Sequence, residues 1–249
     1  MEKKISSLLS VDTNAKTVKG QKRGYLTGIL YLAPSNESGA INVCPHASAG
    51  CRAACLYTAG RGTFSNVKQA RINKTLWFAD DRKAFVAQIK KDIAALIRKA
   101  KRMNLIPCVR LNGTSDLPWE NFGIMQEFPK LKFYDYTKNY KRMLRFMAGK
   151  MPSNYTLVFS RSETNDKDCR AILSKGGNVA MVFAGKELPK HVSFDWPGSW
   201  RKTCKGSHAH KVFNGDESDL RFLDPTGVIV GLTAKGKARK DNSGFTINN

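Results

Sequence analysis

The chain has 249 residues with 41% hydrophobic content and a formal net charge of +22, so it is long enough to bury a full core. We interpret residues 1–249 as a single α/β domain. No stretch approaches the roughly 18 uninterrupted apolar residues of a membrane-spanning helix, and the N-terminus lacks the apolar core of a signal peptide. We therefore expect a cytoplasmic protein that does not associate with a membrane.

The first elements are predicted from residue composition and spacing. Residues 1–23 are polar and basic with weak periodicity, so we expect an N-terminal arm or edge structure. Residues 24–33 are rich in β-branched and aromatic side chains and end at Pro34, which predicts a strand. Apolar residues at three- and four-residue intervals then predict two amphipathic helices, over 65–78 and from Asp80 or Asp81 onward.

Short apolar runs alternate with helical stretches beyond Pro107. They predict strands over 108–111, 131–135, 155–160 and 178–183, and helices over 119–128, 139–148 and 165–174. Such alternation is typical of parallel strands joined by crossover helices, so residues 24–185 are interpreted as strand–helix units. Residues 186–249 are expected to be a long irregular segment followed by a final strand over 227–232 and a basic tail.

Three of the six cysteines, Cys44, Cys51 and Cys55, lie close together directly after the first predicted strand. Because cytoplasmic thiols stay reduced, metal ligation explains this cluster better than a disulfide framework. Thiolates are soft ligands that suit iron–sulfur clusters and zinc. Cys204 is our choice for a fourth ligand, and the alternatives to it are His46, His208 and His210.

The cysteine spacing bears on which metal is held. The gap of six residues between Cys44 and Cys51 fits poorly with the C-x2-C knuckles of structural zinc. A [4Fe-4S] cluster is therefore preferred, with Zn²⁺ as the alternative cofactor. A further alternative is that all six cysteines are inert thiols, as we expect for Cys108 in a strand and Cys169 in a helix.

Polar residues follow several of the predicted strands. Ligands of parallel α/β folds bind at the carboxyl ends of the strands, so we expect a ligand-binding crevice beside the cysteine loop. Each polar residue taken singly is also explained by turn or helix-cap chemistry. The candidate crevice residues are Arg110, Asn112, Ser115, Asp116, Asp135, Lys138, Ser160 and Arg161.

Four motifs together resemble a family of bacteriophage proteins, the gene-product-eighty-eight family. They are the stretches 44–57, 110–116, 134–138 and 231–236, and the resemblance spans most of the chain. It implies a viral origin and therefore the cytoplasm of the host cell.

The order of the elements also resembles a known architecture. A cysteine loop after the first strand, followed by strand–helix units, is similar to the partial (β/α)6, TIM-like barrel of radical S-adenosylmethionine enzymes. Those enzymes use C-x3-C-x2-C and leave one iron open for their cofactor. This chain has C-x6-C-x3-C and no clear Gly-Gly-Glu stretch, so the cysteine spacing does not support S-adenosylmethionine binding.

Three functions are compatible with these patterns. The leading hypothesis is a phage iron–sulfur protein that transfers electrons or performs a redox reaction with an unidentified redox partner or small anionic ligand. The second is a zinc-stabilised nucleic-acid-binding protein, because the charge is high and aromatic residues such as Tyr134, Tyr136, Trp196 and Trp200 lie near basic ones.

The third hypothesis is a metal-dependent nuclease. Its hard-cation ligands would be Asp116, Asp135, Asp216, Asp219 and Asp224. No HExxH, Walker or GxSxG motif assigns a catalytic residue, so the sequence leaves open whether the protein is an enzyme.

Overall fold

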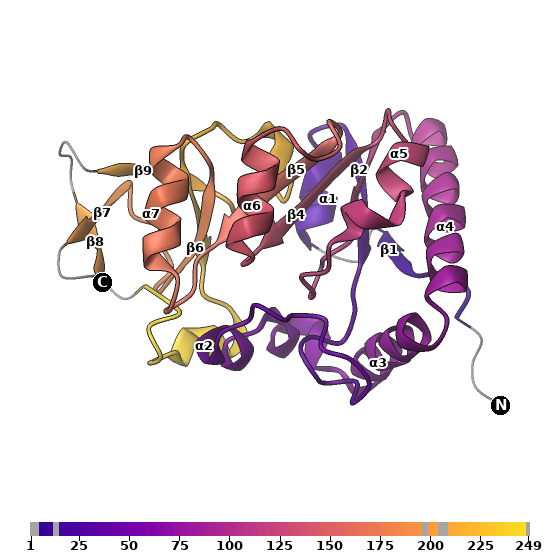
Figure 1. The fold of residues 1–249 in the computed structure, drawn as a ribbon, viewed down its shortest axis with the longest axis horizontal. Helices are drawn as coiled ribbons and strands as arrows, with labels where there is room; N and C mark the ends of the chain where they lie inside the picture. Colours follow the sequence, from indigo (N-terminus) through magenta and orange to yellow (C-terminus); the bar gives the residue numbers. More distant parts are fainter. Residues whose placement is uncertain (1–4, 12–14, 196–198, 204–208, 248–249) are drawn as a thin grey trace.

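The computed structural model describes residues 5–11, 15–195, 199–203 and 209–247. Within these ranges the chain forms one mixed sheet of ten strands in the order β1-β2-β3-β4-β5-β6-β10-β9-β7-β8. Figure 1 shows helices packed against this sheet and further helical segments across one end of its strands.

A parallel run of strands forms the centre of the sheet, as the alternating pattern predicted. Each neighbouring pair from β2 to β6 is parallel, and β6 continues in parallel through β10 to β9. In spatial order the strands are β2 (Tyr25–Leu30), β3 (Ile106–Arg110), β4 (Lys132–Thr137), β5 (Tyr155–Ser160), β6 (Val179–Phe183), β10 (Ile229–Thr233) and β9 (His210–Asn214).

The two ends of the sheet carry antiparallel strands. At one end β1 (Leu9–Val11) pairs with β2 and is followed by helix α1 (Ala15–Gln21), so the N-terminal segment includes an edge strand. At the other end β7 (His191–Asp195) pairs with both β8 (Ser199–Thr203) and β9. The sequence predicted a long irregular segment after residue 186, and the described part of that segment includes three short strands.

Helices cover one face of the sheet. The longer ones are α4 (Arg82–Arg102), α6 (Tyr140–Met147) and α7 (Asp166–Ser174), whereas α3 (Ser65–Asp80) lies across the end of the strands and contacts α4 (Figure 1). Helix α4 begins where the sequence indicated, because the Asp81 side chain accepts a hydrogen bond from the Ala84 amide and acts as the N-cap. Its buried residues recur at three- and four-residue intervals, which places one stripe against the core: Phe85, Ile89, Ile93, Leu96 and Ala100.

The predicted helix over 119–128 is divided into two pieces. A 3-10 turn, η3 (Trp119–Phe122), precedes the short helix α5 (Ile124–Glu127), and Gly123 between them has φ 71°. Because glycine adopts this left-handed conformation without steric cost, it ends one turn and starts the next. The other short elements are α2 (Ala49–Ala53), η1 (Leu56–Thr58), η2 (Gly60–Thr63), η4 (Arg221–Leu223) and η5 (Gly236–Lys240).

The opposite face of the sheet is covered by the segment between β9 and β10. Its turn η4 packs against β4 and β5, and Leu220 and Phe222 contact Tyr134 of β4 in a buried cluster. The same segment reaches α1 at the far edge, where Lys19 Nζ lies 3.2 Å from the carbonyl oxygen of Asp216. The described strands form an open sheet, and on this face the segment after β9 extends as far as α1.

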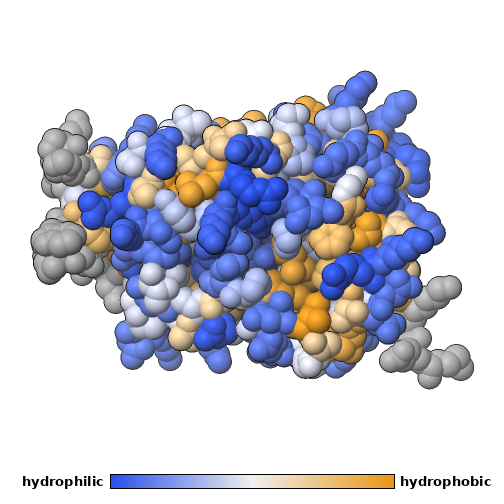
Figure 2. Space-filling view, viewed as in Figure 1, coloured by the Kyte–Doolittle hydropathy of each residue, from blue (hydrophilic) through white to orange (hydrophobic). Residues whose placement is uncertain are grey.

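The surface agrees with the composition. The face drawn in Figure 2 is mostly hydrophilic, with smaller apolar areas between the polar ones. Among the described helices, none combines the length and apolar character needed to cross a membrane.

The turn after β3 provides a test of this packing. A Cβ added to Gly113 would lie 2.6 Å from the Leu30 carbonyl oxygen, a backbone atom that cannot move aside easily. We expect Gly113→Ala to lower the free energy of unfolding by about 1–3 kcal/mol, as overpacking does, in a chemical denaturation experiment. Gly20→Ala, in α1, is the control, because a Cβ there meets only ordinary contacts of 3.8–3.9 Å with Tyr25 and Leu220. An unchanged stability of Gly113→Ala would contradict the close approach of the two strand ends.

Candidate metal centre and adjoining crevice

The segment that carries the clustered cysteines lies across the carboxyl ends of the parallel strands. Its start is joined to the loop after β3, because the Val43 carbonyl accepts a hydrogen bond of 2.8 Å from the Asp116 amide. Its middle is joined to the loop after β5, where the Glu163 carboxylate accepts hydrogen bonds of 2.8 Å from Ser48 Oγ and from the Gly50 amide. The cysteine loop is thus fixed over the edge at which ligands of parallel sheets bind.

The C-terminal segment closes against the same loop. Figure 1 shows α2 beside the yellow segment that follows β10, and a Cβ on Gly50 would collide with Ser243 Oγ and with Glu163. Cys51 packs in a small apolar cluster with Ala234, Ala238 and Phe245. Because glycine alone fits between these groups, Gly50 allows the helical turn to seat against the strand ends.

The three cysteines occupy successive positions on this loop. Cys44 precedes α2, Cys51 lies within it and Cys55 follows it, so a helical turn does separate the last two. All three thiols are free and half-buried. The Cys44 thiol donates a hydrogen bond of 3.5 Å to the Thr114 carbonyl oxygen, and all three thiols lie near enough for their charges to interact.

Burial sets the protonation of two of these thiols. Desolvation raises the pKa of Cys44 to about 12, and the neighbouring Cys55 and Cys51 add to the rise. Desolvation also raises the pKa of Cys55 above its ordinary value of 9.0, although Arg71 and Lys138 nearby act in the opposite direction. In the absence of a bound cation both thiols are therefore protonated at neutral pH.

Two basic side chains stand beside Cys55. Arg71 of α3 places its guanidinium 4.9 Å from the centre of the Tyr31 ring and 5.4 Å from that of Tyr57. Its Nη1 is buried and has no hydrogen-bond partner among the described residues. Lys138, which follows β4, donates to Ser160 Oγ at 2.6 Å. Both cations are thus positioned to interact with negative charge at the thiols.

The described residues contain no group of three His, Cys, Asp or Glu side chains that could hold one metal ion. Two of the predicted ligands, Cys204 and His208, lie outside the described residues. Of the alternative ligands, His46 is exposed and His210 lies in β9 with its ring 6.0 Å from that of Trp200. Cys108 and Cys169 are fully buried in β3 and α7.

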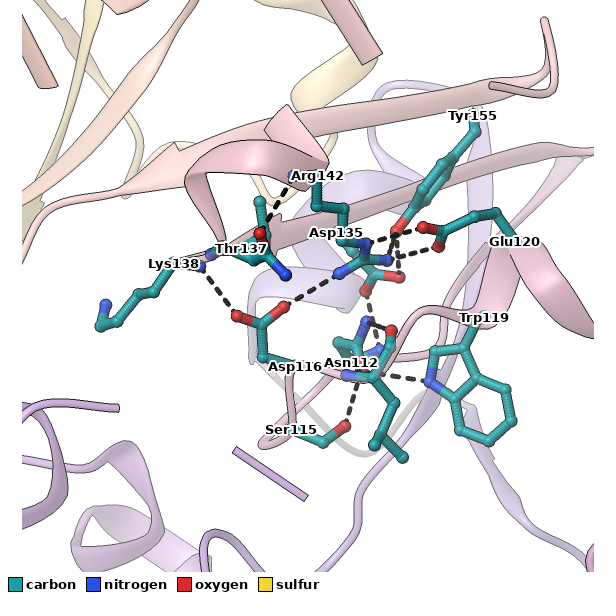
Figure 3. Close-up of polar contacts among 12 residues, drawn as sticks. Asn112, Ser115, Asp116, Trp119, Glu120, Asp135, Thr137, Lys138, Arg142 and Tyr155 are labelled. Carbon is teal, nitrogen blue, oxygen red and sulfur yellow. Dashed lines mark hydrogen bonds and ion pairs between the residues drawn. The ribbon is translucent and has the colours of Figure 1, made fainter. Parts of the chain in front are cut away.

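A polar network joins the loop after β3 to the helix layer (Figure 3). Asp135 of β4 is buried, and its carboxylate accepts hydrogen bonds from the Asn112 amide at 2.7 Å and from Tyr155 Oη at 3.1 Å. Asn112 Oδ1 in turn accepts bonds from Ser115 Oγ and from Trp119 Nε1. These bonds fix the backbone of the loop after β3.

Arg142 of α6 joins the two sides of this network (Figure 3). It donates to Asp116 at 2.9 Å, to both oxygens of Glu120 at 3.0 and 2.7 Å, and to Tyr155 Oη at 2.7 Å. The remaining Asp116 oxygen accepts a bond from the Lys138 amide. Because a buried arginine needs this many acceptors, the network explains why acidic residues flank the loop after β3.

Seven of the eight predicted crevice residues are connected to one another. Asn112, Ser115, Asp116, Asp135 and Lys138 belong to the network of Figure 3. Ser160 and Arg161 join it through Lys138, whose ammonium also lies 3.3 Å from the Arg161 carbonyl oxygen.

Both arginines among the predicted crevice residues, Arg161 and Arg110, have partners within the protein. The Arg161 guanidinium is held by Asp166 and by the carbonyl oxygens of Gly244 and Phe245. Arg110 lies on the opposite face of the sheet, where it pairs with Asp219 at 2.9 Å. Ligand binding by the eight predicted crevice residues stays a prediction.

The five carboxylates of the nuclease hypothesis lie on two sides of the sheet. Asp116 and Asp135 belong to the Arg142 network, whereas Asp219 pairs with Arg110 and Asp224 lies 3.2 Å from Arg221. The Asp216 carboxylate accepts bonds from Thr233 and from Lys235. Each carboxylate thus has protein partners, and the sheet separates the first two from the others.

Two residues of the site were not singled out by the sequence. Arg71 lies in an amphipathic helix among other basic residues, so its place beside a thiol had no sequence signal. Glu163 lies three positions after the predicted strand over 155–160, at the mouth of the sheet, but it is not one of the predicted crevice residues. Its partners Ser48 and Gly50 are more than a hundred positions away in the chain, so the contact itself could not be inferred.

Asp135 should make stability depend on pH. Burial raises the pKa of its carboxyl group from 3.8 to about 7. The folded protein therefore retains a proton that the unfolded chain releases, and this contribution to stability is present below pH 3.8 and lost as the pH rises toward about 7. We expect the isosteric Asp135→Asn substitution to remove this decline in stability. The melting temperatures of the two proteins, measured from pH 4 to 7, should therefore differ by an amount that changes with pH. A difference that stays constant from pH 4 to 7 would contradict the raised pKa.

A family model described as Gene product 88 matches residues 7–249. The match spans the cysteine loop, the crevice and every strand of the sheet. No curated protein and no solved structure matches the chain.

Proposed function

We propose that this chain, which belongs to the Gene product 88 family of bacteriophage proteins, is an iron–sulfur protein that takes part in electron transfer or another redox reaction. Cys44, Cys51 and Cys55 would hold a [4Fe-4S] cluster over the carboxyl ends of the parallel strands. The observation that carries this proposal is that three half-buried thiols of one loop lie over the strand ends and interact electrostatically, and that Cys55 also interacts with the charges of Arg71 and Lys138.

The arrangement of charge supports an anionic metal group. A [4Fe-4S] cluster held by thiolates has a net negative charge, and nearby cations and hydrogen bonds adjust its reduction potential. Arg71 has a buried Nη1 without a hydrogen-bond partner in the described part of the chain. An anionic cluster would supply the charge that this guanidinium lacks.

The spacing of the thiols supports a cluster over a single zinc ion. Zinc holds each sulfur at about 2.3 Å, which brings its ligands close together. The gap of six residues between Cys44 and Cys51 is wider than that of the C-x2-C knuckles usual for structural zinc. A cube with four irons takes one thiolate at each corner, so its ligands can stand farther apart.

The surroundings are consistent with this role. The thiols need a reducing compartment, so we place the protein in the cytoplasm of the host cell. We also interpret the sheet as a partial (β/α)6 barrel, because β2, β3, β4, β5, β6 and β10 are neighbours and parallel. The crevice beside the cluster, with Lys138 and Ser160 at its rim, would receive the redox partner or a small anionic ligand.

Replacement of single cysteines tests the ligands. After anaerobic purification and reconstitution with iron and sulfide, we expect about four irons and four sulfides per chain, determined by chemical analysis. Cys44→Ala, Cys51→Ala and Cys55→Ala should each lose most of this content. Cys108→Ala and Cys169→Ala are the matched controls, because these thiols are buried away from the loop, and they should keep it. Equal iron content in all five variants would overturn the assignment.

Cys204 decides whether the cluster has an open iron. If this residue is the fourth ligand, Cys204→Ala should lower cluster content or convert it to a three-iron form, detected by EPR of the oxidised protein. If the variant keeps a four-iron cluster with an unchanged spectrum, the fourth iron has another ligand and Cys204 is excluded.

The two cations should raise the reduction potential of the cluster. Reduction adds negative charge, so removal of a nearby positive charge disfavours the reduced form. We expect Arg71→Gln and Lys138→Gln each to shift the potential to more negative values by roughly 60 mV, which is a tenfold change in a one-electron equilibrium, in a redox titration. Lys91→Gln on the exposed side of α4 is the control and should leave the potential unchanged. A shift of the same size in the control would show that the effect is not local.

A further inference from the structure

A second concave site lies apart from the cysteine loop, at the carboxyl ends of β9 and β10. It is a groove of about 700 Å³, bounded by Lys19 of α1, by the segment 186–190 after β6, and by residues that end β9 and β10. None of its lining residues belongs to the cysteine loop or to the polar network of Figure 3. The groove therefore needs an explanation of its own.

Only some of the charged side chains of this groove have hydrogen-bond or ion-pair partners among the described residues. Lys235 pairs with the Asp216 carboxylate at 2.9 Å, and Lys19 donates to the Asp216 carbonyl oxygen. That carboxylate also accepts bonds from the Thr233 amide and hydroxyl. Its negative charge is thus directed toward residues of the groove wall rather than toward a ligand.

Lys186 and Lys190 have no such partners. Both are exposed, and neither side chain makes a hydrogen bond or ion pair with another residue in the described ranges. They stand on either side of Leu188 and Pro189, which supply part of the apolar wall. Glu187 is the one acidic lining residue that does not have a described partner, so unpaired positive charge exceeds unpaired negative charge at the rim.

The composition of the lining indicates the chemistry of the ligand. Lysine ammonium groups act as point charges that suit phosphate oxygens. The lining contains no aromatic side chain on which a base could stack and no arginine fork for the edge of a base. Recognition in this groove would therefore involve phosphates and would not depend on base sequence.

The size of the groove and the net charge of the chain favour a single nucleic-acid strand as the ligand over a duplex or a small anion. The volume is in the range of about 300–1,000 Å³ that encloses one small ligand, so a flexible backbone can enter it whereas a stiff duplex can lie only across the rim. The net charge of +22 would draw a polyanion toward this face more strongly than a monovalent or divalent ion. We propose that the groove binds the phosphate backbone of a single-stranded nucleic acid.

This proposal does not depend on the iron–sulfur cluster. It predicts salt-dependent, sequence-independent binding of a labelled single-stranded oligonucleotide by the full chain, measured by fluorescence anisotropy. Lys186→Glu together with Lys190→Glu should weaken binding at least about tenfold and reduce the slope of log K against log salt by about 1.4, since each strand phosphate contact contributes about 0.7.

A matched control has the same change of charge at a distant place. Lys91→Glu together with Lys101→Glu alters two exposed lysines of α4 and should change the affinity less than about twofold. The milder pair Lys186→Gln and Lys190→Gln tests the same site with less risk to folding, which circular dichroism checks in every variant. Equal weakening by the two Glu pairs would overturn the proposal, because binding would then follow net charge alone. Tighter binding of a duplex, or binding of inorganic triphosphate without binding of the oligonucleotide, would overturn it as well.

Discussion

The contact between Glu163 and the start of α2 determines where the cysteines lie. The carboxylate accepts hydrogen bonds from Ser48 Oγ and from the Gly50 amide, and the absence of a side chain at Gly50 lets Ser243 approach from the C-terminal segment. Three regions far apart in the sequence thus meet at one point. The positions of Cys51 and Cys55 over the strand ends follow from that contact.

Buried charge has two different roles around this point. Arg142 is surrounded by acceptors, Asp116, Glu120 and Tyr155, and this network serves to hold loops in place. Replacing one member of such a network is costly because the others remain buried without partners. Arg71 and Lys138, by contrast, direct positive charge toward a thiol that burial keeps protonated. A bound anionic cluster would pair with these two cations through its negative charge. Its iron would also favour the deprotonated form of the thiols.

Much of the fold could be predicted because its central strands and helices have strong periodic patterns. The strand over 155–160 and the cap at Asp81 are examples in which the local sequence and the final structure agree. The strands β7, β8 and β9, each five residues long, were missed because proline and glycine residues interrupt this part of the sequence. Such short strands are stabilised by pairing with neighbours, which the local sequence does not reveal.

The site was predicted less completely, because its contacts join segments that are far apart in the sequence. Parallel topology correctly indicated that the polar strand ends meet, and Asn112, Asp116 and Lys138 do lie together. Topology alone did not show that Arg110 points to the opposite face, although its place in β3 next to the buried Val109 contained that information. The electrostatic interaction of Arg71 with Cys55 depends on how α3 packs beside the cysteine loop, which the local sequence does not reveal.

The most direct test of the central claim is EPR spectroscopy of the protein purified without oxygen and reduced with dithionite. The iron–sulfur assignment predicts the signal of a reduced [4Fe-4S] cluster, present in the unmodified chain and absent from the Cys55→Ala variant. A reduced protein that shows no such signal and contains one equivalent of tightly bound zinc would contradict the assignment.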